Sequence, residues 1–206
     1  MKTNLAEVGA RGVDSLEFSQ SGTAAQATSL KASGIDFVVG YLGVVNPTRL
    51  GYVLSADLAF VPTTLAATVF DGDRSVSQCK ALGLPAGMTV WLDLEGNTIC
   101  KMSTPELIGK INGWASAIKT AGYEPGLYVG APQPLTSEEL YKLAVVRYWH
   151  SLSREADRFG KLAEPSCGWC MWQMNPSLKW RNTGLLVDVD IIGKDFLGRL
   201  PSWACA

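Results

Sequence analysis

Short apolar runs alternate with segments of helical periodicity along this 206-residue chain, and that alternation restricts the folds available to it. A strand, a helix and a second strand in succession place the two strands parallel in one sheet, with the helix packed on its face. The alternation is regular, and no low-complexity linker interrupts it. The sequence therefore predicts one α/β domain over residues 1–206.

Eight segments have the apolar, β-branched or aromatic content of strands, and five have the 3.6-residue periodicity of helices. The predicted strands are 12–15, 35–42, 58–62, 88–95, 126–129, 145–150, 170–173 and 185–192. The predicted helices are 23–33, 48–55, 73–82, 103–118 and 137–143, and 16–22 is interpreted as the first loop. After residue 150 the connections contain Asn, Pro and Gly rather than a helical stripe, so few helices are expected there.

Eight mostly parallel strands in a chain of this length favour a closed TIM barrel of the (β/α)8 type, near its lower size limit. The expected variant has about five βα units followed by three strands with few helices. An open, doubly wound sheet is the alternative. In a barrel, reactive side chains gather at the carboxyl ends of the strands. The polar residues at such positions are Asp14, Asp93, Glu95, His150, Gln173, Asp188 and Asp190.

Asp93 and Glu95 stand at the end of an otherwise apolar strand. Alternate residues of a strand point the same way, so these two acids share a face while Leu92 and Leu94 take the other. Two carboxyl groups a few ångströms apart compete for protons, and one tends to stay protonated near neutral pH. That division suits acid-catalysed bond cleavage. The alternative is structural: acids in a loop turn, solvated or paired with Arg or Lys.

The balance of charge excludes several classes of partner. With 18 basic and 19 acidic residues the chain has a formal charge of -1, so it has no broad positive field for nucleic acid.

No segment has the apolar length of a signal peptide or a membrane span, so we expect a protein made in the cytoplasm without membrane insertion. No Gly-rich phosphate loop is present, which argues against nucleotide cofactors.

Cysteine and histidine usage argues against a metal centre. Five cysteines, an odd number spread along the chain, indicate reduced thiols rather than a disulfide scaffold. Cys167 and Cys170 form a Cys-x-x-Cys pair that suits a redox site or half a zinc site, but no second ligand pair follows, so packing cysteines are favoured. His150 is the only histidine, so a metal site built on several histidines is excluded. We expect no metal and no other cofactor.

Seven short stretches complete the pattern, in order along nearly the whole chain: 12–15, 33–39, 91–95, 126–128, 148–149, 172–173 and 187–190. Together they resemble glycoside hydrolase family 25, the lysozyme-like muramidases, and the related glycoside-hydrolase-like barrels of phages and actinobacteria. That family is known for five βα units followed by three strands. The resemblance implies a glycosidase that cuts the β-1,4 bond after N-acetylmuramic acid in peptidoglycan, as a phage endolysin or a delivered cell-wall-degrading effector would.

The resemblance also implies residue roles. Glu95 is the general acid and Asp93 its carboxylate partner, while Asp14 and Asp188 complete the acidic mouth. Asp93 would stabilise the oxocarbenium-like transition state or orient the substrate's 2-acetamido group, and both routes stay open. Asp190 stands where the family often has Asn. The candidate substrate-binding residues are Tyr41, Tyr128, Trp149, His150, Trp172, Gln173 and Asp190, although aromatic residues in barrel strands also serve as core.

Two other functions fit the same pattern: a non-catalytic carbohydrate-binding barrel, such as a phage structural component, and a barrel enzyme for a small metabolite. The expected partner is peptidoglycan or a related glycan, and the expected state is a monomer. Without an export signal, the protein would act on the cell wall after release through a partner or by delivery.

Overall fold

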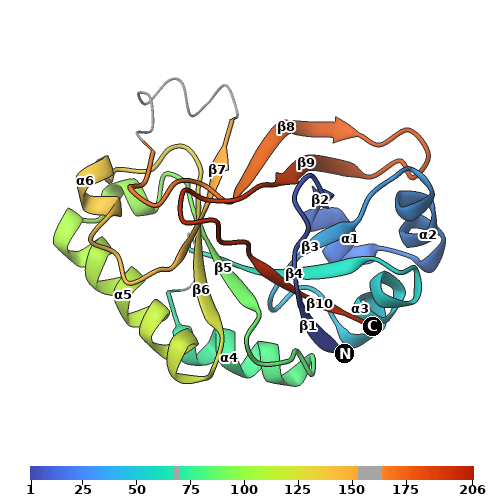
Figure 1. Ribbon diagram of the computed structural model, residues 1–206, viewed down its shortest axis with the longest axis horizontal. Helices are drawn as coiled ribbons and strands as arrows, with labels where there is room; N and C mark the ends of the chain where they lie inside the picture. The colour runs from blue at the N-terminus through green and yellow to red at the C-terminus, as the bar shows by residue number, and fades with distance from the viewer. Residues whose placement is uncertain (67–69, 153–163) are drawn as a thin grey trace.

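The computed structural model describes residues 1–66, 70–152 and 164–206, and these form a closed eight-stranded barrel (Figure 1). Neighbouring strands pair in parallel from β2 through β8, whereas β9 is antiparallel to both β8 and β2 and closes the ring. The predicted barrel is therefore confirmed, and the open sheet is excluded. The barrel strands are β2 (Arg11–Asp14), β3 (Phe37–Tyr41), β4 (Ala59–Leu65), β5 (Thr89–Leu94), β6 (Glu124–Val129), β7 (Arg147–Ser151), β8 (Met171–Lys179) and β9 (Leu186–Ile192).

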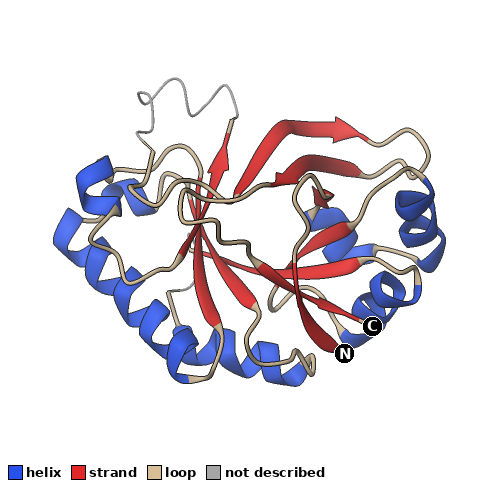
Figure 2. Cartoon of the chain, in the orientation of Figure 1, coloured by secondary structure: helices blue, strands red, loops and turns tan. Residues whose placement is uncertain are grey.

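Helices follow each of the first five barrel strands and lie outside the sheet (Figure 2). The β8–β9 connection is a hairpin turn, so this part of the ring has the few helices that the sequence predicts. None of the helices in the described ranges is long and apolar enough to cross a membrane. The helices are α1 (Leu16–Ser21), α2 (Ala24–Ala32), α3 (Pro47–Ser55), α4 (Gly72–Ala81), a 3₁₀ turn η1 (Ile99–Lys101), α5 (Thr104–Thr120) and α6 (Ser137–Leu140).

Side-chain caps fix where several helices begin. Thr23 and Gln26 form a reciprocal capping box at α2, and Asn46 caps α3 ahead of a proline at its first position. Ser15 caps α1 by accepting a hydrogen bond from the Phe18 N–H. The prediction of a loop over 16–22 is therefore wrong, because that single capped turn continues into a six-residue helix.

Strand alternation divides the core into two layers. One set of side chains fills the barrel interior, and the other packs between the strands and the helices. The apolar stripe of α5 belongs to the outer layer, as its periodicity predicts. The interior includes Phe37, Val39, Val61, Trp91, Trp149, Met171 and Ile192.

Two further strands lie outside the ring and were not predicted. Strand β1 (Lys2–Leu5) pairs antiparallel with β10 (Ser202–Cys205), so the two termini lie side by side (Figure 1). Strand β10 joins the sheet where Ala204 faces Phe60 of β4. Trp203 packs on Phe37, at the amino ends of the barrel strands. The pair therefore covers the end of the barrel opposite the strands' carboxyl ends.

Candidate functional site

Five carboxyl groups come together at the carboxyl ends of the parallel strands, in the region we call the mouth. Asp14 ends β2, Asp93 lies in β5 and Glu95 follows β5 directly. Asp188 and Asp190 belong to the first part of β9, because this strand runs against the others and enters the ring from the mouth. Their predicted placement at a strand's carboxyl end is therefore wrong. They still reach the cluster, since Asp188 stands opposite Asp14 in the ladder.

Asp93 and Glu95 differ in exposure although they belong to one motif. Asp93 is 6% exposed, and its Oδ1 atom has no hydrogen-bond partner among the described residues, whereas Glu95 is half-buried. Burial is the main cause that raises the pKa of Asp93 well above its usual value, and the charge of Glu95 adds to it. Asp93 therefore ionises less readily than a solvated aspartate, and it is more deeply buried than Glu95.

The Glu95 carboxyl group is placed by β6. Its Oε2 atom lies 3.4 Å from the hydroxyl of Tyr128, which donates toward it. A Cβ atom on Gly130, just past β6, would lie 2.1 Å from the same Oε2 atom. A larger residue at position 130 would therefore require the Glu95 carboxyl group to move. Because Tyr128 and Gly130 are alternate residues, both face the mouth.

Asp14 is held by Tyr41 from the neighbouring strand. The Tyr41 hydroxyl donates a hydrogen bond of 2.9 Å to Asp14 Oδ2. Burial and, to a smaller extent, the Asp188 charge raise the pKa of Asp14 to about 8, although the Tyr41 hydrogen bond opposes both effects. Burial also raises the pKa of the Tyr41 hydroxyl, so it stays a neutral donor. Asp14 is thus a group that exchanges its proton near physiological pH.

Asp188 is the best solvated of the four aspartates and the most strongly hydrogen-bonded. Its Oδ2 atom accepts from Gln173 Nε2 at 3.2 Å, and its Oδ1 atom accepts from the backbone N–H of Ser177. Burial raises the pKa of Asp188, and the Ser177 hydrogen bond opposes that shift. Gln173 itself is buried, and its Oε1 atom accepts from Tyr128 at 3.0 Å and from Ser151 at 3.1 Å.

Asp190 lies deeper in the barrel and is fully buried. Neither of its oxygens has a hydrogen bond of standard geometry within the described residues, although the indole N–H of Trp149 lies close enough to favour its charged form. Burial nevertheless raises the pKa of Asp190 well above its usual value, and the charges of Asp14 and Asp188 add to that shift. Asp190 therefore favours its neutral form far more than a solvated aspartate does.

No cation balances the aspartates of the mouth. Within the described residues, none of Asp14, Asp93, Asp188 and Asp190 forms an ion pair. The barrel instead stores protons, because burial and mutual repulsion both favour the neutral acids. Such a cluster supplies protons near neutral pH, which is the chemical capacity of this site.

The structure separates the predicted substrate-binding residues into two groups. Tyr41, Tyr128 and Gln173 reach the acids through the hydrogen bonds given above. Trp149 is 1% exposed and packs against Tyr128 with a centroid distance of 4.4 Å, so it is interior core rather than a sugar platform.

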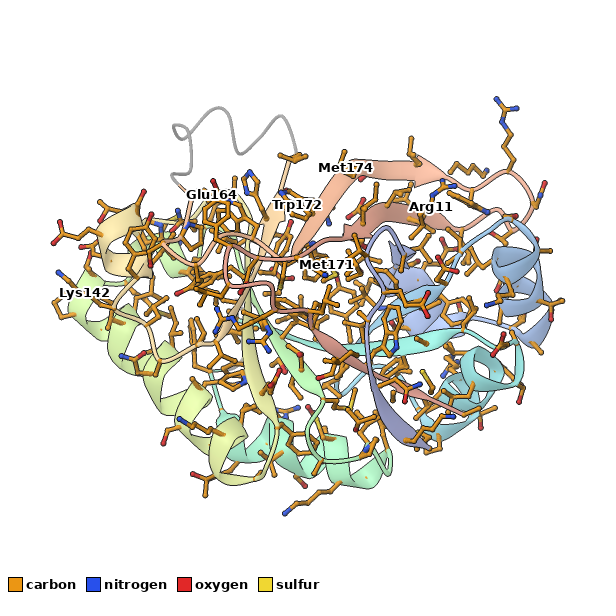
Figure 3. The ribbon with its side chains drawn as sticks, viewed as in Figure 1. Arg11, Lys142, Glu164, Met171, Trp172 and Met174 are labelled. Carbon is orange, nitrogen blue, oxygen red and sulfur yellow. The ribbon has the colours of Figure 1, made fainter. Side chains whose placement is uncertain are left out.

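His150 and Trp172 are not brought to the acids. His150 follows the inward-pointing Trp149, and Trp172 precedes the inward-pointing Gln173. Strand alternation therefore points both side chains to the outer face of the barrel. His150 stacks on Trp169 with a centroid distance of 4.5 Å. Trp172, which Figure 3 labels, packs on the outer core layer. The prediction that His150 and Trp172 lie beside the acids is therefore corrected: both side chains pack on the outer face of the barrel.

A cleft of about 320 Å³ opens beside Asp14 and Asp188, at the lower end of usual ligand-pocket volumes. Leu16 and Glu17 of the α1 region and Ser177 and Leu186 of the β8–β9 hairpin line it. A larger hollow of about 440 Å³ lies around Trp203 at the opposite end, far from the acids. Of these two, the cleft at the mouth is the one that adjoins the cluster of buried acids, through Asp14 and Asp188.

The described residues contain no group of three or more His, Cys, Asp or Glu side chains suited to a metal ion. Cys167 and Cys170 are free thiols, and burial raises the pKa of Cys170 to about 12. A thiol with so high a pKa is a poor nucleophile and a poor metal ligand.

Three contributors to the site were missed in the sequence. Ser151 supports Gln173, the Ser177 N–H supports Asp188, and Gly130 makes room for Glu95. Ser151 has the same strand parity as Trp149, which could have indicated an inward side chain. The role of Ser177 depends on a positive φ of 56° in the β8–β9 hairpin, and no local sequence signal predicts it.

Comparisons with known proteins agree with this geometry. A family model described as "Rv2525c-like, glycoside hydrolase-like domain" matches residues 11–175. A search of curated protein sequences found no significant match. Among the solved structures that share the fold, three are described below, and sequence identities of 13–14% show the fold alone.

The Tat-secreted protein Rv2525c of Mycobacterium tuberculosis has a TM-score of 0.63 and 14% identity, over 94% of this chain and 99% of that one. A family 25 glycosyl hydrolase from Bacillus anthracis has a TM-score of 0.60 and 13% identity, over 92% and 91%. The modular Cpl-1 endolysin, complexed with a peptidoglycan analogue, has a TM-score of 0.60 and 14% identity, over 92% of this chain and 56% of that one. The chain belongs to the Rv2525c-like, glycoside hydrolase-like domain family.

Proposed function

We propose that this protein is a glycosidase that cleaves the β-1,4 bond after N-acetylmuramic acid in peptidoglycan, with Glu95 as the general acid. One observation carries the proposal: the half-buried Glu95 carboxyl group shares a strand face with the buried Asp93 carboxyl group at the mouth of the barrel, and burial raises the pKa of Asp93. A pair of carboxyl groups with different environments is the arrangement that glycoside hydrolysis requires.

The proposed reaction begins with transfer of the Glu95 proton to the glycosidic oxygen. The bond between that oxygen and the anomeric carbon breaks, and positive charge develops on the sugar ring. Water then adds its hydroxyl to the anomeric carbon and returns a proton to Glu95. Asp93 stabilises the charge, either at the ring itself or by orienting the neighbouring acetamido group. Because burial raises the pKa of Asp93, its proton must pass to solvent water at the mouth before the carboxylate can stabilise that positive charge.

The choice of substrate is supported by two observations. The cleft beside Asp14 and Asp188 offers carboxyl and hydroxyl groups that suit sugar hydroxyls. The fold is shared with an endolysin that was solved with a peptidoglycan analogue. We further propose that the protein acts on the cell wall as a monomer, after release or delivery.

The test is release of new reducing ends from purified peptidoglycan. Wild-type protein should release them, and Glu95→Gln should lower the rate by at least about 100-fold because the amide cannot donate a proton as an acid does. The matched control is Glu106→Gln on α5, which changes an exposed acid in an i,i+4 ion pair and should keep wild-type activity. Binding of glycan by wild-type protein without any cleavage would instead support the carbohydrate-binding alternative.

A further inference from the structure

One hydroxyl hydrogen in the mouth has two acceptors. The Tyr128 oxygen lies 3.0 Å from Gln173 Oε1 and 3.4 Å from Glu95 Oε2, and it faces both as the donor. A phenol has one O–H, so it can make only one of these hydrogen bonds well at a time. Burial and the nearby acids raise the pKa of Tyr128 well above its usual value, so the donor is present throughout the physiological range.

Gln173 is fixed in the orientation that offers its oxygen to Tyr128. Its amide nitrogen donates to Asp188 Oδ2 at 3.2 Å, which directs Oε1 toward Tyr128 and Ser151. The Ser151 hydroxyl lies 3.1 Å from the same Oε1 atom. When Tyr128 turns away, the Ser151 hydroxyl therefore remains within donating distance of Gln173 Oε1.

We propose that Tyr128 and Gln173 form a hydroxyl switch that follows the protonation of Glu95. While Glu95 holds its proton, the Tyr128 hydroxyl donates to Gln173, which is the shorter of the two contacts. When Glu95 has given its proton away, the hydroxyl turns to the new carboxylate, because hydrogen bonds to charged acceptors are stronger. Tyr128 and Gln173 are thus positioning residues that stabilise the ionised acid only after proton transfer.

The other groups around Glu95 set the background for this switch. Asp93 on its own strand, Tyr128 on β6 and Asp14 on β2 interact with it electrostatically, and Asp188 on β9 adjoins Asp14. All of these carboxyl groups disfavour a charge on Glu95 when they are ionised. The Tyr128 hydroxyl is a neutral donor that the structure directs toward Glu95. Changing Tyr128 or Gln173 alters no formal charge, so an effect on Glu95 reports the hydrogen bond itself.

The switch predicts opposite effects for two neutral substitutions. In Tyr128→Phe the ionised Glu95 loses its donor, so the titration midpoint of Glu95 should rise by about one pH unit. In Gln173→Met the Tyr128 hydroxyl loses its alternative acceptor and donates to Glu95 in both protonation states. The titration midpoint of Glu95 should therefore fall by a similar amount. Tyr123→Phe is the matched control, because that buried hydroxyl donates to the Leu84 carbonyl far from the mouth.

The experiment is an NMR titration of ¹³C-labelled glutamate carboxyl groups in the wild type and the three variants, with Glu95→Gln to assign the Glu95 signal. The inference rests on the proposed function only in naming Glu95 as the acid, and the titration needs no substrate. Opposite shifts for Tyr128→Phe and Gln173→Met, with no shift for Tyr123→Phe, support the switch. Shifts in the same direction, or none, overturn it even if wild-type protein cleaves peptidoglycan. Opposite shifts without any cleavage would overturn the glycosidase assignment alone.

Discussion

Asp190→Asn tests whether the barrel interior stores a proton at a cost in stability. The folded protein keeps Asp190 neutral, since its pKa is raised well above the usual value, mainly by burial. In the unfolded chain the same carboxyl ionises near pH 3.9. Between those two pKa values the folded state binds one more proton than the unfolded state, so stability falls as pH rises.

The size of this effect follows from the pH interval. Each pH unit contributes about 1.4 kcal/mol, so the interval from 3.9 to 7 corresponds to at most about 4 kcal/mol. Asn has nearly the same shape as neutral Asp but no proton to hold. Asp190→Asn should therefore stabilise the protein by up to about 4 kcal/mol at pH 7, or roughly 10 °C in melting temperature. Below about pH 4 the gain should vanish, because both states of the wild type are then protonated.

The assay is thermal unfolding of the wild type and Asp190→Asn at pH 4 and pH 7. Asp73→Asn is the control, because this exposed acid in the first turn of α4 should change stability by less than about 1 kcal/mol at either pH. Destabilisation by Asp190→Asn at pH 7, or an equal effect at both pH values, would refute the reasoning. Either result would mean that Asp190 is ionised or otherwise compensated inside the barrel.

Three further predictions concern single contacts. Gly130→Ala places a methyl group 2.1 Å from Glu95 Oε2, so kcat should fall about 10- to 100-fold in the reducing-end assay while far-UV circular dichroism is unchanged. Tyr41→Phe removes the hydrogen bond that opposes the raised pKa of Asp14, so a carboxyl titration by NMR should move that pKa above about 8. Leu92→Ala empties a fully buried position in the outer core layer and should cost about 2–5 kcal/mol in denaturant unfolding, with the pH dependence of stability retained.

The alternation of strands and helices was enough to predict the ring, because each βα unit is local in sequence. Its helix is marked by capping residues or by an apolar face that the sequence shows. Strands β1 and β10 escaped prediction for the opposite reason. Each has four residues, and the two pair with each other from opposite ends of the chain, while β10 also pairs with β4. Helix α1 was missed because six residues carry too little periodicity to identify.

The acidic residues of the site could be predicted from the sequence, but their hydrogen-bond partners could not. Asp14, Asp93 and Glu95 end apolar runs, which the sequence displays directly. Strand parity already separates Trp149 from His150, and Trp172 from Gln173, since neighbours on a strand point to opposite faces. The contact between Tyr128 and Gln173 depends instead on the register of separate strands around a closed ring, and no pattern in the sequence fixes it.

The most direct test of the glycosidase assignment is mass spectrometry of borohydride-reduced products from purified peptidoglycan incubated with wild-type protein. We expect fragments that end in reduced N-acetylmuramic acid from the wild type and from Glu106→Gln. The digest with Glu95→Gln should contain none of these fragments. Fragments that end in reduced N-acetylglucosamine would contradict the proposed bond. Intact glycan strands after prolonged incubation with folded wild-type protein would contradict the claim that Glu95 delivers a proton to a glycosidic oxygen.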